Sequence, residues 1–110
     1  MQHREGFTSV SFTSVPQRAF EQFKAIAERR KVFPRDVFSE AIRELLEARR
    51  AGPVQYLASR KGGIRRAMWL EDDLVEDMRA AAEADTVTQT ELFINAMRLY
   101  LAKEGIDLEV

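Results

Sequence analysis

Two short segments of the sequence place side chains that can bind a ligand at every second position. They carry Ser9, Ser11 and Thr13 in the first segment, and Arg65, Ala67 and Trp69 in the second. A spacing of two puts alternate side chains on one face of a β-strand. Hydroxyl groups donate and accept hydrogen bonds, a guanidinium donates several in a fixed geometry, and Ala and Trp offer apolar contact. Both segments therefore suit recognition rather than covalent chemistry.

The side chains that catalysis or metal binding requires are almost missing. The chain has no cysteine, and its single histidine, His3, stands alone near the N-terminus. It also lacks a glycine-rich phosphate loop and a set of nucleophile, base and acid residues. The acidic residues Asp72, Asp73, Glu76 and Asp77 are interpreted as a solvated helix surface. We therefore predict that the protein is not an enzyme and has no catalytic residue, no metal ligand and no cofactor.

The charge of the chain is divided unequally along its length. The 110 residues have a net charge of −1. Residues 1–66 contain fourteen Lys and Arg against seven Asp and Glu, whereas residues 67–110 contain three against eleven. The split indicates one surface that suits phosphate and another that suits water, although helix surfaces can also differ in solubilising charge alone. Apolar runs are too short for a membrane span and no signal peptide is evident, so we expect a cytoplasmic protein.

The chain contains an internal repeat. Residues 15–48 align with residues 70–103 without a gap, and nine of the 34 aligned positions are identical. Each copy has a strand-like segment followed by two amphipathic helical patterns. One such copy is too small to bury an adequate core, and its single strand has no partner. Two copies solve both problems, because their strands can pair antiparallel while four helices cover one side.

This reasoning predicts a single domain over residues 1–110 that is mainly α-helical with a two-stranded antiparallel β-ribbon. The predicted units are a first repeat at 7–50, a linker at 51–63 and a second repeat at 64–105. Tyr56 and Leu57 are expected to attach the linker to the core.

Capping residues mark the predicted helix starts. Ser14 and Gln17 form a candidate capping box for the first helix, and Thr88 and Glu91 form one for the last. Pro34 suits the first turn of the second helix, where its missing N–H costs nothing. The turns between the helices are expected at residues 31–34 and 85–88.

The pattern of strand, helix, break and capped helix resembles the MetJ/Arc ribbon-helix-helix family. The second copy carries the resemblance best, in residues 65–74 (RRAMWLEDDL) and 88–92 (TQTEL). The two-copy form is similar to tandem members among the conjugative plasmid accessory proteins, such as the TraY group. The resemblance covers nearly the whole chain and implies a single-chain pseudo-dimer of bacterial or mobile-element origin.

Members of this family read bases in the major groove of double-stranded DNA with the outer face of their β-ribbon. The resemblance therefore implies base contacts from the six residues of the two strand segments. Arg65 can donate two hydrogen bonds to a guanine, and Ala67 or Trp69 can contact a thymine methyl group. Partial burial of Trp69 against a helix or the linker fits the sequence equally well.

A second implication of the resemblance concerns the N-termini of the second helix of each copy, which bind a DNA phosphate in this family. The corresponding residues here are Arg35, Thr88, Gln89 and Thr90. Arg60 and Lys61 precede the second strand and are expected to contact the DNA backbone as well. Pro34 removes one N–H donor, so the two phosphate sites are expected to be unequal.

The register of the first strand is ambiguous from the sequence. The gap-free alignment places Val10, Phe12 and Ser14 on the outer face, whereas side-chain polarity places Val10 and Phe12 inside. We favour polarity, which requires one extra residue between the first strand and its helix. Strict alternation also turns Arg66 inward, which suggests a bulge in the second strand or a later start.

Unequal halves imply recognition of an asymmetric DNA sequence, either as a transcriptional repressor or as a relaxosome accessory factor at a transfer origin. Because so small a protein contacts few base pairs, cooperative binding of several copies is expected, and a relaxase or another protein is a candidate partner. The competing interpretation is a protein-interaction module, antitoxin-like or an adaptor, with little or no DNA binding. The low net charge favours this rival.

Overall fold

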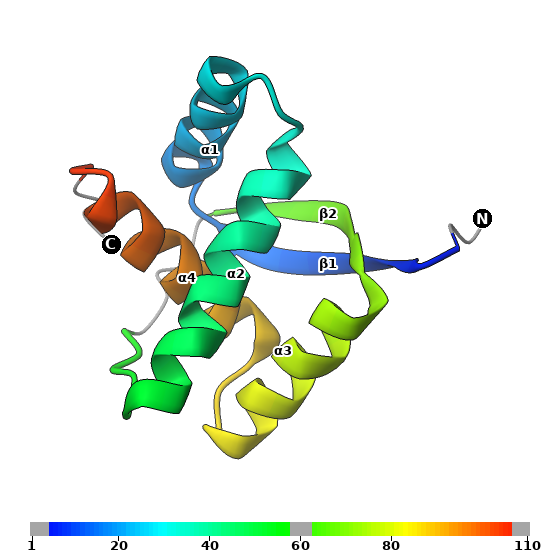
Figure 1. The fold of residues 1–110 in the computed structure, drawn as a ribbon, viewed down its shortest axis with the longest axis vertical. Helices are drawn as coiled ribbons and strands as arrows, with labels where there is room; N and C mark the ends of the chain where they lie inside the picture. The colour runs from blue at the N-terminus through cyan, green and yellow to red at the C-terminus, as the bar shows by residue number, and fades with distance from the viewer. Residues whose placement is uncertain (1–4, 58–62, 107–110) are drawn as a thin grey trace.

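The computed structural model describes residues 5–57 and 63–106, and within them the chain forms two strands and four helices (Figure 1). In chain order these are β1 (Phe7–Val15), α1 (Gln17–Arg30), α2 (Pro34–Ala51), β2 (Ile64–Glu71), α3 (Asp72–Ala84) and α4 (Gln89–Lys103). The expected fold class, mainly helical with a two-stranded antiparallel sheet, is confirmed at this level. No helix in the described part of the chain is long and apolar enough to cross a membrane.

β1 and β2 pair antiparallel into a ribbon, and one face of this ribbon packs on the helices. Phe7 pairs with Glu71 and Phe12 with Arg66, and the register then shifts before Val15 pairs with Ile64. The inner face contributes buried side chains to one continuous apolar core, including Val10, Phe12, Val15 and Leu70. The two rings of Phe12 and Phe93 stack with centroids 4.0 Å apart, which joins β1 directly to α4.

The turns between the two helices of each half have the same backbone geometry at equivalent positions. Lys31 and Thr86 both adopt left-handed conformations, with φ of 57° in each case. The N–H groups of Val32 and Val87 both donate to the carbonyl five residues earlier, at 3.0 Å. These bonds satisfy carbonyl groups that the end of a helix leaves free. The repeat seen in the sequence is therefore also a repeat of local structure.

The predicted helix caps are partly right. Thr88 Oγ1 accepts a hydrogen bond from the Glu91 N–H at 3.0 Å, and the Glu91 carboxylate accepts one from the Thr88 N–H at 2.9 Å, so this capping box is confirmed. The predicted capping box of Ser14 and Gln17 is wrong. α1 has Pro16 at its N-cap without a side-chain hydrogen bond, because a bulge at the end of β1 redirects Ser14.

The segment that joins the halves is attached to α3 and α4 by polar contacts, as expected for Tyr56 and Leu57. The Tyr56 hydroxyl donates to Asp85, which also accepts two hydrogen bonds from Arg49 at 2.7 and 2.8 Å. The buried amide of Asn95 bonds to both the N–H and the carbonyl of Leu57. Hydrogen bonding from Arg49 and Tyr56 lowers the pKa of Asp85 to about 2, while burial and then Asp85 raise the pKa of Tyr56 to about 12.

Candidate nucleic-acid interface

The ribbon face that points away from the core gathers all six side chains that the sequence predicted to contact bases. We call this set the outer face: Ser9, Ser11, Thr13, Arg65, Ala67 and Trp69. Ser11 pairs with Ala67 across the middle of the ribbon, and Ser9 pairs with Trp69. Four of the six side chains are exposed, whereas Ser9 and Trp69 are half-buried. The outer face is thus a continuous surface with hydroxyl groups, one guanidinium and one indole.

A bulge in β1 creates this arrangement. Thr13 and Ser14 together oppose Arg65, and Ser14 adopts a left-handed φ of 55°. The extra residue reverses the register relative to the gap-free alignment, so Val10 and Phe12 point inward. The interpretation based on polarity is correct and the gap-free alternative is wrong.

Gly63 makes the bulge possible, because a Cβ atom there would collide with the backbone of Ser14 and Val15. A glycine at a strand often marks a bulge or a site where another backbone approaches closely. The sequence offered this glycine only as part of a linker, so its role was not predicted.

Arg66 points inward without any bulge in β2, so the suggested irregularity or later start of that strand is wrong. Its guanidinium lies over the Phe20 ring, with its carbon 4.6 Å from the ring centroid. Its Nε is buried and has no hydrogen-bond partner among the described residues. Burial of a polar atom without a hydrogen bond costs free energy. The Phe20 ring compensates part of this cost, because a cation over a ring face is attracted by the ring quadrupole.

The N-terminus of α2 lies beside one end of the outer face. The Arg35 guanidinium lies over the rings of Phe7 and Phe33, 5.1 and 5.4 Å from their centroids. Phe33, Pro34, Arg35, Met68 and Trp69 line a hollow of about 380 Å³ between this helix end and β2. Partial burial of Trp69 against a helix is therefore observed, while its strand position keeps it on the outer face. Sequence patterns did not predict the contact of Arg35 with Phe7 and Phe33, because it joins a strand to a helix start distant in the sequence.

The N-terminus of α4 lies beside the other end of the outer face. Thr90 Oγ1 accepts a hydrogen bond from the Thr13 N–H at 3.3 Å, which ties this helix end to the bulge. Thr88 and Glu91 form the capping box, while the N–H groups of Gln89 and Thr90 have no partner among the described residues. Two N–H groups and a threonine hydroxyl are therefore available for an anion.

The two helix ends differ in the donors that they leave free. At α2, the Asp36 carboxylate accepts from the Phe33 N–H at 3.1 Å, and Pro34 has no N–H. The N–H of Arg35 and its guanidinium remain. Asp36 and Glu91 also place a negative charge at each end, which weakens the attraction for an anion. Within the described residues the two helix ends therefore differ in their free donors, and unequal phosphate sites stay a prediction.

Arg60 and Lys61, which were predicted to contact the DNA backbone, lie outside the described residues, as does His3. Within residues 5–57 and 63–106, no group of three or more His, Cys, Asp or Glu side chains could hold a metal ion.

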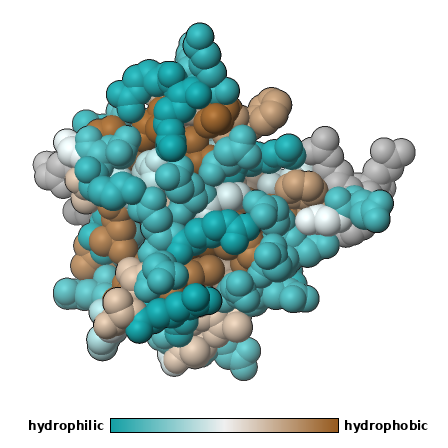
Figure 2. Space-filling view, viewed as in Figure 1, coloured by the Kyte–Doolittle hydropathy of each residue, from teal (hydrophilic) through white to brown (hydrophobic). Residues whose placement is uncertain are grey.

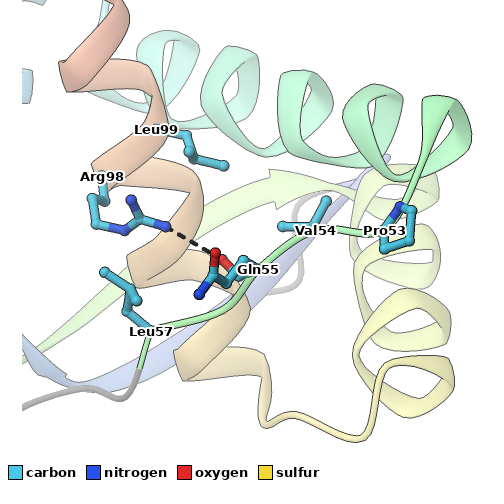
Figure 3. Close-up of a pocket in the computed structure, with 6 residues that line it drawn as sticks. All are labelled: Pro53, Val54, Gln55, Leu57, Arg98 and Leu99. Carbon is cyan, nitrogen blue, oxygen red and sulfur yellow. Dashed lines mark hydrogen bonds between the residues drawn. The ribbon is translucent and has the colours of Figure 1, made fainter.

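A second hollow, of about 510 Å³, lies between the linker and α4 (Figure 3). Leu57 and Leu99 line it and are exposed, and Arg98 donates to the Gln55 carbonyl at 3.4 Å.

No protein-family model, curated protein or solved structure matches the chain. The interpretation of the outer face and its flanking helix ends therefore depends on their own geometry and chemistry.

Proposed function

We propose that the protein binds double-stranded DNA sequence-specifically, with the outer face of its ribbon in the major groove. The observation that carries this proposal is the outer face itself. It presents three hydroxyl groups, one guanidinium, one methyl group and one indole on the side of the ribbon that the helices leave uncovered. A two-stranded ribbon fits the major groove of B-DNA, where each base pair presents its own donors and acceptors. The order β-α-α-β-α-α agrees with a single-chain ribbon-helix-helix pseudo-dimer.

The flanking helix ends support the same proposal. The N-termini of α2 and α4 lie at opposite ends of the outer face, beside Trp69 and Thr13 respectively. Each can hold one phosphate of the DNA backbone with main-chain N–H groups, and Arg35 adds a charge at the α2 end. In this arrangement the helix ends fix the position of the protein, and the ribbon reads the bases.

The target site is asymmetric in this proposal. Ser9 and Arg65 occupy corresponding positions on either side of the central Ser11–Ala67 pair, as do Thr13 and Trp69. One half therefore presents small hydroxyl groups where the other presents a guanidinium and an indole. We propose that the protein acts in the cytoplasm of a bacterium as a repressor or as a transfer-origin accessory factor.

Selection of bound sequences from random duplex DNA tests the proposal directly, because an asymmetric consensus is expected. Arg65→Ala should reduce discrimination at one base pair by about tenfold, which corresponds to one bidentate contact. Arg35→Ala should weaken binding to all sequences alike and reduce the salt dependence by about one ion. Arg50→Ala is the control, because its exposed side chain lies in the last turn of α2, at the end opposite to the phosphate site.

The competing candidate is a protein-interaction module, which the exposed Leu57 and Leu99 beside the linker hollow favour. Affinity for duplex DNA at two salt concentrations separates the two functions. DNA binding predicts measurable affinity that falls steeply with salt. No affinity at low salt would reject the DNA proposal and leave a relaxase, a toxin or another protein as the partner class.

A further inference from the structure

The helices α1 and α3 occupy opposite ends of the molecule in Figure 1, and each exposes one long face. Figure 2, drawn from the same side, shows hydrophilic side chains over much of the surface at both ends. Each helix packs its apolar stripe into the core and turns the other side to solvent. The two helices are equivalent in the repeat, so their exposed faces can be compared position by position.

The comparison separates one stripe along the exposed face from the positions on one side of it. Those neighbouring positions keep the same charge in both helices: Glu21 and Glu76, Lys24 and Arg79, Glu28 and Glu83. The stripe follows a spacing of four, three and four residues, which keeps it on one side of the helix. In α1 it reads Arg18, the half-buried Gln22, Ala25 and Arg29, and in α3 it reads Asp73, Asp77, Ala80 and Ala84. Its charge is therefore positive in α1 and negative in α3.

The charges of these stripes are mostly free of partners inside the molecule. Arg18 and Asp77 form no ion pair or side-chain hydrogen bond within the described residues, and Arg29 has only a long contact of 3.9 Å with Glu104. Asp73 accepts only the neighbouring Leu74 N–H. Apart from the long Arg29–Glu104 contact, these side chains form no ion pair within the described residues, so their charge is available to a partner.

The α3 stripe also borders a hollow that can accept a long side chain. Asp77, Ala80, Ala84 and Leu46 line this hollow of about 320 Å³, together with two arginines of α2. Both arginines are already paired, Arg49 with Asp85 and Arg50 with Glu47. The unpaired charge at the hollow is therefore the carboxylate of Asp77, beside two small side chains that permit close approach.

We propose that the α3 stripe binds the α1 stripe of a second copy of this chain. Contact between two α1 stripes or two α3 stripes would repel, whereas contact between α1 and α3 attracts. Because the two stripes lie at opposite ends of one molecule, the contact is head-to-tail and leaves a free stripe at each end of the pair. Exposed ion pairs are individually weak and are screened by salt, so the association is weak and favoured at low ionic strength.

Sedimentation equilibrium without DNA tests this contact separately from the proposed DNA binding. In about 20 mM salt, where screening is weak, the average mass of the wild type should rise with protein concentration up to the millimolar range. In about 1 M salt, where the Debye length is only about 3 Å, the protein should be monomeric. A wild type that stays monomeric at low salt overturns the proposal.

Charge reversal identifies the faces. The double substitution Arg18→Glu with Arg29→Glu makes both stripes acidic, and Asp73→Lys with Asp77→Lys makes both basic, so each should raise the dissociation constant by about tenfold or more. Combining all four substitutions restores complementary stripes and the wild-type net charge, and should restore association. Circular dichroism checks folding, and Asp73→Asn with Asp77→Asn replaces the lysine variant if it does not fold. Association that survives either reversal, or that fails to return in the combined variant, contradicts the assignment.

Discussion

The N-termini of α2 and α4 show how the two halves share a backbone while differing in surface chemistry. Both helices have an acidic residue three positions after the N-cap, and both carboxylates accept a hydrogen bond from the N-cap N–H. The N-cap itself is Phe33 in one half and Thr88 in the other, and only Thr88 returns a side-chain hydrogen bond. The first end is aromatic and cationic, whereas the second is rich in hydroxyl groups.

This difference separates the residues that both halves need for folding from the surface residues that can vary between the halves. The turn geometry at Lys31 and Thr86 and the buried aromatic rings of Phe38 and Phe93 recur because both halves pack into one core. The side chains at the ribbon ends make no such common contacts. They can therefore differ, and in the proposed function this difference makes the two DNA half-sites unequal.

The strongest test of the comparison replaces the equivalent core rings. Phe38 stacks on Phe20 and Phe23, while Phe93 stacks on Phe12, and both are almost fully buried. Phe38→Ala or Phe93→Ala should each lower the free energy of unfolding by about 3–5 kcal/mol. Trp69 fluorescence and far-UV circular dichroism should report the same transition in both variants. Separate transitions would show that the halves fold independently and would break the shared-core argument.

The β1 bulge belongs to one half only, and Gly63 is the residue that permits it. Gly63→Ala should destabilise the fold by about 2 kcal/mol, because the new methyl group displaces the backbone of Ser14 or Val15 and strains the ribbon. Gly52→Ala is the matched control, since nothing lies within 4 Å of its added Cβ and its backbone is extended. Thermal unfolding of the two variants measures the difference. Equal stability of the two variants would contradict the claim that the close approach of Gly63 to the backbone of Ser14 and Val15 requires a glycine.

Much of this architecture could be predicted from the sequence, because periodicity and repetition are global signals. Nine identities in a gap-free alignment, together with the polarity of residues 7–13, were enough for the element order and for the outer face. The Thr88–Glu91 capping box was also predictable, because its signal lies within four residues. These features depend on local chemistry or on an average over many positions.

The features that were mispredicted or missed depend on contacts between distant residues. Ser14 satisfies the local rule for a cap, yet the approach of Gly63 from the other strand places it in a bulge. Arg66 keeps the alternation of β2 and places a charge on the inner face, because Phe20, far away in the sequence, covers its guanidinium. Likewise, the aromatic neighbours of Arg35 come from β1 and from the turn before α2.

Asp85 and Arg30 occupy equivalent positions of the two halves but have opposite charges and different partners. Arg30 pairs with Glu40 and Tyr100, whereas Asp85 pairs with Arg49 and Tyr56. With the pKa of Asp85 lowered to about 2 from 3.8, chiefly by Arg49, its stabilisation of about 2 kcal/mol is present above pH 4 and is lost as the pH falls towards 2. The pKa of Tyr56, raised to about 12 by burial, adds stability that is lost as the pH rises from 10 towards 12.

Asp85→Asn should therefore lower the stability at neutral pH and flatten its decline below pH 4. Urea unfolding at pH 7, 4 and 2.5 measures both effects. The variant and the wild type should converge at the lowest pH, where the wild-type carboxyl group begins to be protonated. A difference that stays constant over this range would remove the carboxylate charge as the cause.

The smallest expected change in stability comes from substitutions at the two N-caps, Phe33 of α2 and Thr88 of α4. Thr88→Ala removes a side-chain hydrogen bond to the helix N-terminus and should cost about 1 kcal/mol. Phe33→Ala should change stability by less than this, because the Phe33 side chain is 67% exposed and caps nothing by hydrogen bonding. It should instead weaken DNA binding, since Arg35 loses one of the rings that hold its guanidinium. If Phe33→Ala lowers stability while leaving DNA affinity unchanged, the aromatic end serves the fold rather than recognition.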